Sequence, residues 1–170
     1  IAQCLVGSEM CIRDSYYTNF TYWTQHCWGV TCVNDMEAML SYLPITIGDK
    51  EQALAGLARC YEKMMMRSHT NGGYVNLLDE CWKMCEKFHT NIVIMYDHVS
   101  CKNVGGLHGL FEDQARERGI HLIWIPHDVM DPRTVSRREM REAFSQYMVT
   151  VLNEKPLDPT LLDYEDALSW

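Results

Sequence analysis

The sequence has little of what marks proteins that bind nucleic acid or that remain unfolded. It carries 15 Lys and Arg residues against 23 Asp and Glu residues, a net charge of -8, and no basic run longer than Arg137-Arg138. A surface that binds phosphate backbones needs clustered positive charge, so this composition argues against nucleic acid as a partner. Only five prolines and a hydrophobic fraction of 47% argue against disorder.

Long hydrophobic runs are also missing. No stretch approaches the roughly 20 apolar residues that a membrane-spanning helix requires. No charged segment followed by an apolar one opens the chain, as a secretory leader would. We therefore expect a cytoplasmic protein that has no membrane partner. Its 170 residues suffice for one substantial core.

The chain is rich in cysteine. Its eight cysteines stand at positions 4, 11, 27, 32, 60, 81, 85 and 101. In a small secreted domain they would suggest disulfides, but a large core and no leader favour free thiols. Cys81 and Cys85 share one face of a predicted helix, where core filling is the favoured interpretation over a functional pair.

The first 15 residues are unlike the rest. They show no clean periodicity, caps or turn signals, and they resemble the translated sequencing-adapter read-through seen in assembled environmental reads. We predict that residues 1–15 are a non-native segment. Residues 16–156 are then expected to form the carboxyl-terminal α/β domain of a longer, two-domain subunit. Residues 157–170 would form a tail that packs on a neighbour.

The remaining pattern predicts strands and helices in alternation. Aromatic and β-branched residues favour a strand over 16–23, and the continuous apolar runs 92–95 and 120–125 favour strands covered on both faces. Capping or turn residues predict the starts of four helices: Asn34 or Asp35, Asp49, Gly72-Gly73, and Ser136. The apolar repeat over 107–119 predicts a fifth helix. This order fits a doubly wound, flavodoxin-like parallel sheet. No first strand and helix are found before residue 16, so we expect the sheet to be incomplete at its N-terminal edge.

This pattern makes Cys101 the first candidate for chemistry, because it lies just past the end of the buried strand that contains 92–95. Ligands of open α/β sheets bind at the carboxyl ends of the strands, so Cys101 and Asp128 are expected to face one crevice. A thiolate there can act as a nucleophile with His98 as its base, as a redox partner, or as a metal ligand. One cysteine is too few for an iron-sulfur cluster, so the other ligands would come from elsewhere.

Three weaker signals complete the candidate site. Gly105 and Gly106, with Gly109, are expected to open a helix whose unpaired amides attract an anion, or to form a simple tight helix entry. Asp128 is either a catalytic carboxylate or a turn cap, with Arg133 pairing to Asp128 or Asp131. His26 and Trp28 are expected in a strand-end loop, as a buried cluster or a substrate-facing wall.

At these residues the chain resembles the carboxyl-terminal half of the 2-hydroxyacyl-CoA dehydratase and benzoyl-CoA reductase family. The resemblance covers about residues 16–155. It rests on Ser100-Cys101-Lys102, the helix 107–119, the strand into Asp128-x-x-Asp-Pro-Arg133, the Ser136 helix with Phe144, and weaker matches at His26-Cys-Trp28, Val33-Asn-Asp35 and Asn76-Leu-Leu78. The aromatic start and the tail look most similar to the B subunit of ATP-dependent benzoyl-CoA reductase.

The resemblance implies a [4Fe-4S] cluster between two α/β domains, with two cysteine ligands from the absent amino-terminal domain and one from Cys101. It also implies a homologous reductase subunit as partner and a separate ATP-hydrolysing activator that supplies a low-potential electron. The substrate would be an aromatic acyl-CoA, with benzoyl-CoA reduced to a cyclic dienoyl-CoA. This fragment alone would be inactive. No catalytic residue is assigned.

Two alternatives remain open. A dehydratase of 2-hydroxyacyl-CoA would use the same electron entry, so the cluster does not separate the two reactions. A metal-free α/β binding module, in which Cys101 is a buried structural thiol, belongs to a different class.

Overall fold

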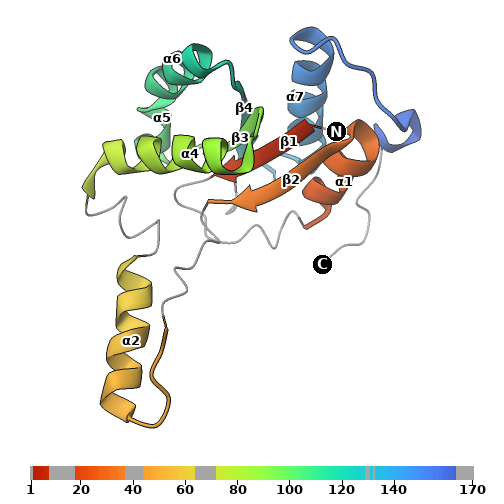
Figure 1. Ribbon diagram of the computed structural model, residues 1–170. Coiled ribbons are helices and arrows are strands. Elements are labelled where there is room, and N and C mark those ends of the chain that lie inside the picture. The colour runs from red at the N-terminus through yellow and green to blue at the C-terminus, as the bar shows by residue number, and fades with distance from the viewer. Residues whose placement is uncertain are drawn as a thin grey trace.

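The computed structural model describes residues 2–7, 18–36, 44–63, 72–128, 131 and 133–163. Along the chain the elements are β1 (Ala2–Gly7), α1 (Thr18–Trp28), β2 (Val30–Asp35), α2 (Lys50–Glu62), α4 (Tyr74–Phe88), β3 (Ile92–His98), α5 (Lys102–Gly105), α6 (His108–Arg118), β4 (His121–His127), α7 (Arg137–Thr150) and the short 3-10 helix Pro159–Leu161. Figure 1 shows their arrangement.

The described strands form one parallel sheet in the order β2-β1-β3-β4. β3 and β4 pair in continuous register over their full length, from Ile92 beside His121 to His98 beside His127. Their carboxyl ends therefore finish level with each other. A mixed α/β fold with a parallel sheet is confirmed.

Helices cover both faces of this sheet (Figure 1). Successive strand residues point to opposite faces, and in β3 Ile92, Ile94 and Tyr96 pack toward one side while Val93 and Met95 pack toward the other. The first set joins a core with α1 and α7, and the second joins a core with α4, α5 and α6. This double burial explains why the run 92–95 is continuously apolar, as the sequence predicted.

The aromatic segment 16–23 was expected to be a strand, and this prediction is wrong for the described part. Thr18–Trp28 is helix α1. Phe20, Trp23 and Trp28 are buried, and each ring contacts the Phe144 ring of α7 edge to face. The large rings of α1 are spaced so that they share one face of the helix, and this face packs against α7. That tertiary contact outweighs the preference of aromatic residues for strands.

The expectation that no strand precedes residue 16 is also wrong. Ala2–Gly7 forms β1, which pairs with β2 on one side and β3 on the other. A six-residue segment without alternation gives little signal by itself, and its strand state depends on partners far along the chain. That residues 1–15 are non-native stays a prediction.

The polar residues proposed as helix starts have mixed outcomes. Asp49 caps α2 by accepting the N–H groups of Glu51 and Gln52, and Ser136 forms a capping box with Glu139. Asn34 instead lies in β2, and the helix expected after it falls on residues 37–43, outside the described residues.

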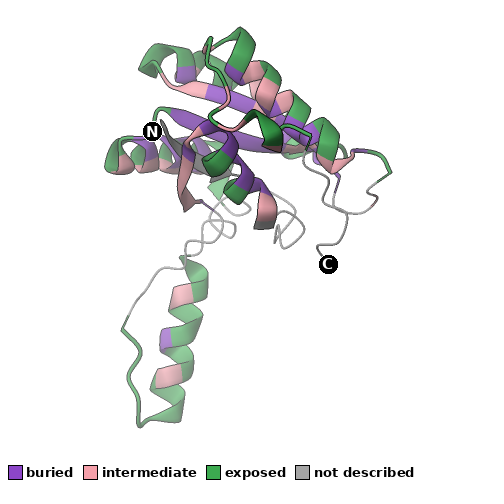
Figure 2. Ribbon diagram, turned by 90° about the vertical axis from the view of Figure 1, so that its right-hand side faces the viewer, coloured by how far each residue is buried: buried purple, intermediate pink, exposed green. Residues whose placement is uncertain are grey.

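Helix α2 projects away from the sheet (Figure 1), and Figure 2 shows it exposed almost all round. Its apolar residues Leu54, Leu57 and Tyr61 are each about half exposed. Gly56 is its one buried residue, with Ile45 beside it.

The start of the tail packs on α1 of the same chain. The Leu157 N–H donates to the Cys27 carbonyl at 2.7 Å, and the Trp23 indole N–H donates to the Leu161 carbonyl at 2.8 Å. Residues 164–170 lie outside the described residues, so packing of the tail on a neighbour stays a prediction.

Phe144 provides a test of the α1–α7 core, because its ring is fully buried and contacts the rings of Phe20, Trp23 and Trp28. We expect Phe144→Ala to lower the free energy of unfolding by about 3–5 kcal/mol, as for other buried aromatic truncations. On the same helix, Val149→Ala is the control and should stay within about 0.5 kcal/mol, because Val149 is half exposed. Denaturant unfolding measures both, and equal losses would contradict this packing.

Candidate functional site at the carboxyl ends of β3 and β4

Cys101 lies where the sequence predicted, just past the carboxyl end of a buried strand. β3 ends at His98, a two-residue turn follows, and Cys101 is the residue before α5. Asp128 directly follows β4. Since the two strands end level, Cys101 and Asp128 lie at the same edge of the sheet.

Hydrogen bonds fix the backbone of the turn that leads to Cys101. The Val99 N–H donates to the His127 carbonyl at 3.0 Å, and the Cys101 N–H donates to the His98 carbonyl at 2.8 Å. The remaining N–H, of Ser100, donates to Nδ1 of the His98 imidazole at 3.0 Å. All three N–H groups between the strand and α5 therefore have partners, and His98 supplies two of them.

These contacts define the state of the His98 ring. Because Nδ1 accepts a hydrogen bond, the proton of the neutral imidazole is on Nε2. Nε2 lies 3.6 Å from Oδ1 of Asp128, which is too long for a hydrogen bond but close enough for electrostatic attraction. Both side chains are less than a tenth exposed, so water weakens this attraction little.

His127 lies beside this pair. Its ring is fully buried, 5.9 Å from the His98 ring and 5.4 Å from the Tyr96 ring, centroid to centroid. Burial, with a further contribution from His98, lowers the pKa of His127 to about 4, although Asp128 acts in the opposite direction. His127 is therefore neutral near neutral pH.

Asp128 also organises the turn that follows β4. Its Oδ1 accepts the Asp131 N–H at 3.2 Å. Arg133 pairs with Asp131 through two contacts, Nε to Oδ1 at 2.9 Å and a terminal guanidinium nitrogen to Oδ2 at 2.7 Å. The sequence-based interpretation of Asp128 as a turn cap is confirmed, with Arg133 bound to Asp131 rather than to Asp128. Asp128 is buried, and a role facing substrate stays a prediction.

The two glycines proposed to bind an anion do not open a helix. Gly105 is the last residue of α5, and its N–H donates to the Cys101 carbonyl at 3.2 Å. The Gly106 N–H donates to the Lys102 carbonyl at 3.0 Å. The expectation of free amides at Gly105 and Gly106 is therefore wrong, because the intervening α5 was not foreseen and it uses both groups.

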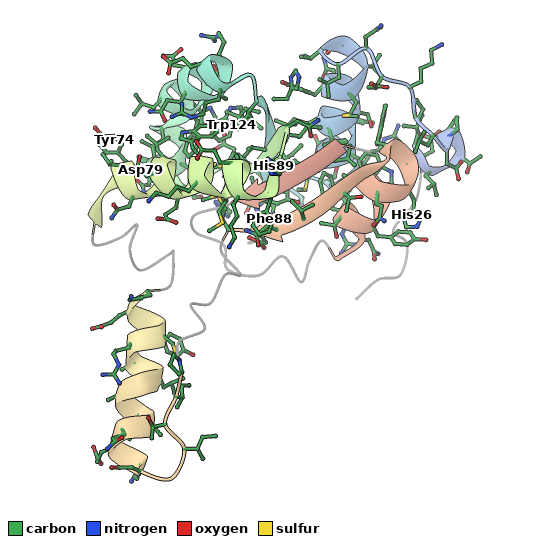
Figure 3. The ribbon with its side chains drawn as sticks, in the orientation of Figure 1. His26, Tyr74, Asp79, Phe88, His89 and Trp124 are labelled. Atoms are coloured by element: carbon green, nitrogen blue, oxygen red, sulfur yellow. The ribbon has the colours of Figure 1, made fainter. Side chains whose placement is uncertain are left out.

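His26 and Trp28 lie at the other end of the sheet. They belong to the last turn of α1, which leads directly into the first residue of β2, so the predicted strand-end loop is wrong. They lie at the amino ends of the parallel strands and Cys101 lies at the carboxyl ends, so a strand length of about 20 Å separates them. Trp28 is buried in the α1–α7 core, while His26 is exposed, stacked on Tyr22, and labelled in Figure 3. They therefore lie at the opposite end of the strands from Cys101 and Asp128.

The surroundings of Cys101 define what it could hold. It is 6% exposed and belongs to the apolar cluster with Val104 and Leu107. Within the described ranges, no group of three or more His, Cys, Asp or Glu side chains could hold a metal ion. The residues present therefore fit one thiolate ligand of a shared group, and they do not fit a complete metal site.

Cys27, Cys81 and Cys85 are buried thiols outside any disulfide that pack in the core, as expected. Cys81 and Cys85 lie in the α4 core, where the hydrogen bond that the Cys81 thiol donates to Cys85, and then burial, raise the pKa of Cys81. Burial, and then the Asp158 charge, raises the pKa of Cys27 to about 11. Both residues with raised pKa values therefore remain protonated thiols near neutral pH.

From the sequence, His98 was expected only as a base for Cys101, and His127 was not expected at the site. A signal was present: each strand ends in a histidine next to an aspartate, Asp97-His98 in one and His127-Asp128 in the other. Parallel strands of equal length bring such ends together, but the register that aligns them is set by the whole sheet.

The protein is an α/β domain with a parallel sheet. It holds a cysteine just past one strand end, and buried His and Asp side chains lie at the same edge of the sheet. The family model described as 2-hydroxyglutaryl-CoA dehydratase, D-component, matches residues 8–148. The chain belongs to this family of dehydratase subunits and related enzymes. No curated protein and no solved structure matched it. None of the described helices is both long and apolar enough to cross a membrane.

The low pKa of His127 predicts a pH-dependent stability. The unfolded chain takes up this proton near pH 6.5, but the folded chain takes it up only near pH 4. Between these values the unfolded state binds more protons, so lowering the pH lowers the free energy of unfolding, by up to about 1.4 kcal/mol per pH unit from this residue. Denaturant unfolding across this range should show a smaller slope in His127→Phe. The exposed His26→Phe is the control, and equal slopes in all three proteins would contradict the assignment.

Proposed function

We propose that this chain is part of an iron-sulfur enzyme subunit that passes low-potential electrons to an acyl-CoA thioester. Cys101 would supply one ligand of a [4Fe-4S] cluster shared with protein outside the described residues. The observation that carries the proposal is the fixed position of Cys101 at the carboxyl edge of the sheet, within the part of the chain that matches the family.

The contribution of the described residues is to hold and shield one sulfur. The hydrogen-bonded turn fixes the Cys101 backbone on one side, and the first turn of α5 fixes it on the other through the Gly105 N–H. Val104 and Leu107 belong to the apolar cluster around it and exclude water. Iron-sulfur clusters supply one-electron transfer at a potential that hydrogen bonding and burial adjust. A cysteine ligand whose backbone is fixed, and whose apolar neighbours keep water away from the bound iron-sulfur cluster, suits that role.

We propose two candidate substrates, with the preferred one first. The resemblance of the aromatic start and the tail to the B subunit of benzoyl-CoA reductase favours benzoyl-CoA, reduced to a cyclic dienoyl-CoA. Membership in the 2-hydroxyglutaryl-CoA dehydratase D-component family favours the second, a 2-hydroxyacyl-CoA that loses water. For either reaction, we propose that the protein is cytoplasmic and that its partners are a homologous subunit and an ATP-hydrolysing activator.

The strand order supports the wider architecture that this role implies. The order β2-β1-β3-β4 is the one shown by the first four strands of flavodoxin-like sheets. We propose that residues 16–156 are one such domain of a two-domain subunit, with the remaining cluster ligands on the other domain.

Replacing the sulfur tests the proposal. In the intact subunit, purified without oxygen together with its partner, we expect Cys101→Ala to lower bound iron and acid-labile sulfide substantially, because one cluster ligand is removed. Cys27→Ala is the matched control, since Cys27 is also buried but lies at the end of α1, beside the amino end of β2 and away from the carboxyl ends of the strands. Its iron content should equal that of the unmodified protein.

Full iron retention in Cys101→Ala would end the proposal. Together with an absence of iron-sulfur absorbance in the unmodified complex, it would favour a metal-free binding module.

The substrate is decided separately. The reconstituted complex, supplied with activator and ATP, is given benzoyl-CoA and a 2-hydroxyacyl-CoA in parallel, and consumption of each is followed by chromatography. We expect benzoyl-CoA to be consumed. Consumption of the 2-hydroxyacyl-CoA alone would establish the dehydratase instead.

A further inference from the structure

We infer that His98 is a positioning residue for Cys101, and that Asp128 of the neighbouring strand end holds the His98 ring in the tautomer this task requires. The inference rests on the proposed function for the part that concerns iron. It adds a specific mechanical role for two residues that neither the family description nor the sequence pattern assigns.

The first step is the geometry of the turn. Two of the three N–H groups that precede α5 donate to His98, one to its carbonyl and one to its ring. The contact from the Ser100 N–H to the side chain two residues earlier has the form of an Asx turn, in which Asn or Asp usually supplies the acceptor. In His98, Nδ1 takes the place of that acceptor oxygen.

The second step is the tautomer. If the proton were on Nδ1, it would face the Ser100 N–H, and two donors would oppose each other across 3.0 Å. The Asp128 carboxylate, 3.6 Å from Nε2, attracts a proton to the far side of the ring. The same oxygen accepts the Asp131 N–H, so its position is set by the turn after β4. The two strand-end turns are therefore coupled through one imidazole.

The third step distinguishes positioning from simple packing. His98 is 7% exposed and lies against His127, so any replacement costs some packing. Side-chain size and acceptor position can, however, be separated. Asparagine is smaller than histidine but has a carbonyl oxygen at the place of Nδ1, whereas glutamine is closer in size but has its polar atoms at the distance of Nε2.

The experiment compares His98→Asn with His98→Gln in the intact subunit, purified without oxygen in its complex, with Cys101→Ala in parallel. Iron loss to a chelator is followed over time, and the midpoint potential and paramagnetic resonance spectrum of the reduced cluster are recorded. We expect iron loss about tenfold or more faster in His98→Gln, as for other changes that disturb ligand orientation. His98→Asn should behave like the unmodified protein, with an unchanged potential.

A second readout needs no metal. Nitrogen NMR of the unmodified protein should show the His98 proton on Nε2 and a bare Nδ1. In Asp128→Ala we expect both tautomers to appear, because the oxygen that faces Nε2 is gone. Alkylation of Cys101 in the iron-free protein should accelerate in His98→Gln and not in His98→Asn.

The outcomes separate this inference from the proposed function. Iron loss in Cys101→Ala with equal iron retention in both His98 variants overturns the positioning role and leaves the function standing. Iron retention in Cys101→Ala removes the function, and the alkylation rates then decide the positioning role alone. A proton on Nδ1 in the unmodified protein, or faster loss in the smaller asparagine variant than in the glutamine variant, overturns the inference.

Discussion

The level ending of β3 and β4 is the constraint on which the rest of the site depends. Their uninterrupted register places His98 beside His127 and brings Asp128 to the His98 ring. A shift of one residue would turn every side chain of one strand to the opposite face of the sheet. The buried contacts of β3 with both cores oppose such a shift, so the packing of the whole sheet fixes the geometry at its edge.

The sequence predicted the elements whose signals are local. The apolar run 92–95, the caps Asp49 and Ser136, and the position of Cys101 after a strand could all be inferred from a few neighbouring residues. α1 could not, because its aromatic residues favour strands until α7 supplies a partner for them. β1 has too few residues for a periodic signal and depends on two partners that are distant in the sequence.

The candidate site shows the same division. Cys101 and Asp128 were located from their place after apolar runs, and the cap formed by Asp128 was foreseen. The contact between His98 and Asp128 could not be predicted, because it depends on the register of two strands and no local sequence pattern contains that register. Gly105 and Gly106 were misplaced because the four-residue helix α5 lies between Cys101 and the longer helix α6. His26 and Trp28 were expected in a strand-end loop because the segment before them, part of helix α1, was interpreted as a strand.

The burial of Cys101 agrees with both interpretations that the sequence left open, a structural thiol in a metal-free module and a ligand at a shared site. A thiol under a surface turn, surrounded by an apolar cluster, is poorly placed to react with solutes in bulk water. Burial of this kind suits a ligand at a seam between domains, where a second protein surface completes the coordination. The hydrogen-bonded turn would hold the Cys101 backbone in place before that surface arrives, which lowers the entropy lost on assembly.

The most direct test is a crystal structure of the intact, oxygen-free complex with the iron positions determined by anomalous scattering. This account predicts an iron atom bonded to the Cys101 sulfur, with the Ser100 N–H still directed at Nδ1 of His98. Iron held entirely by other residues, with the Cys101 sulfur still enclosed in its apolar cluster, would contradict it.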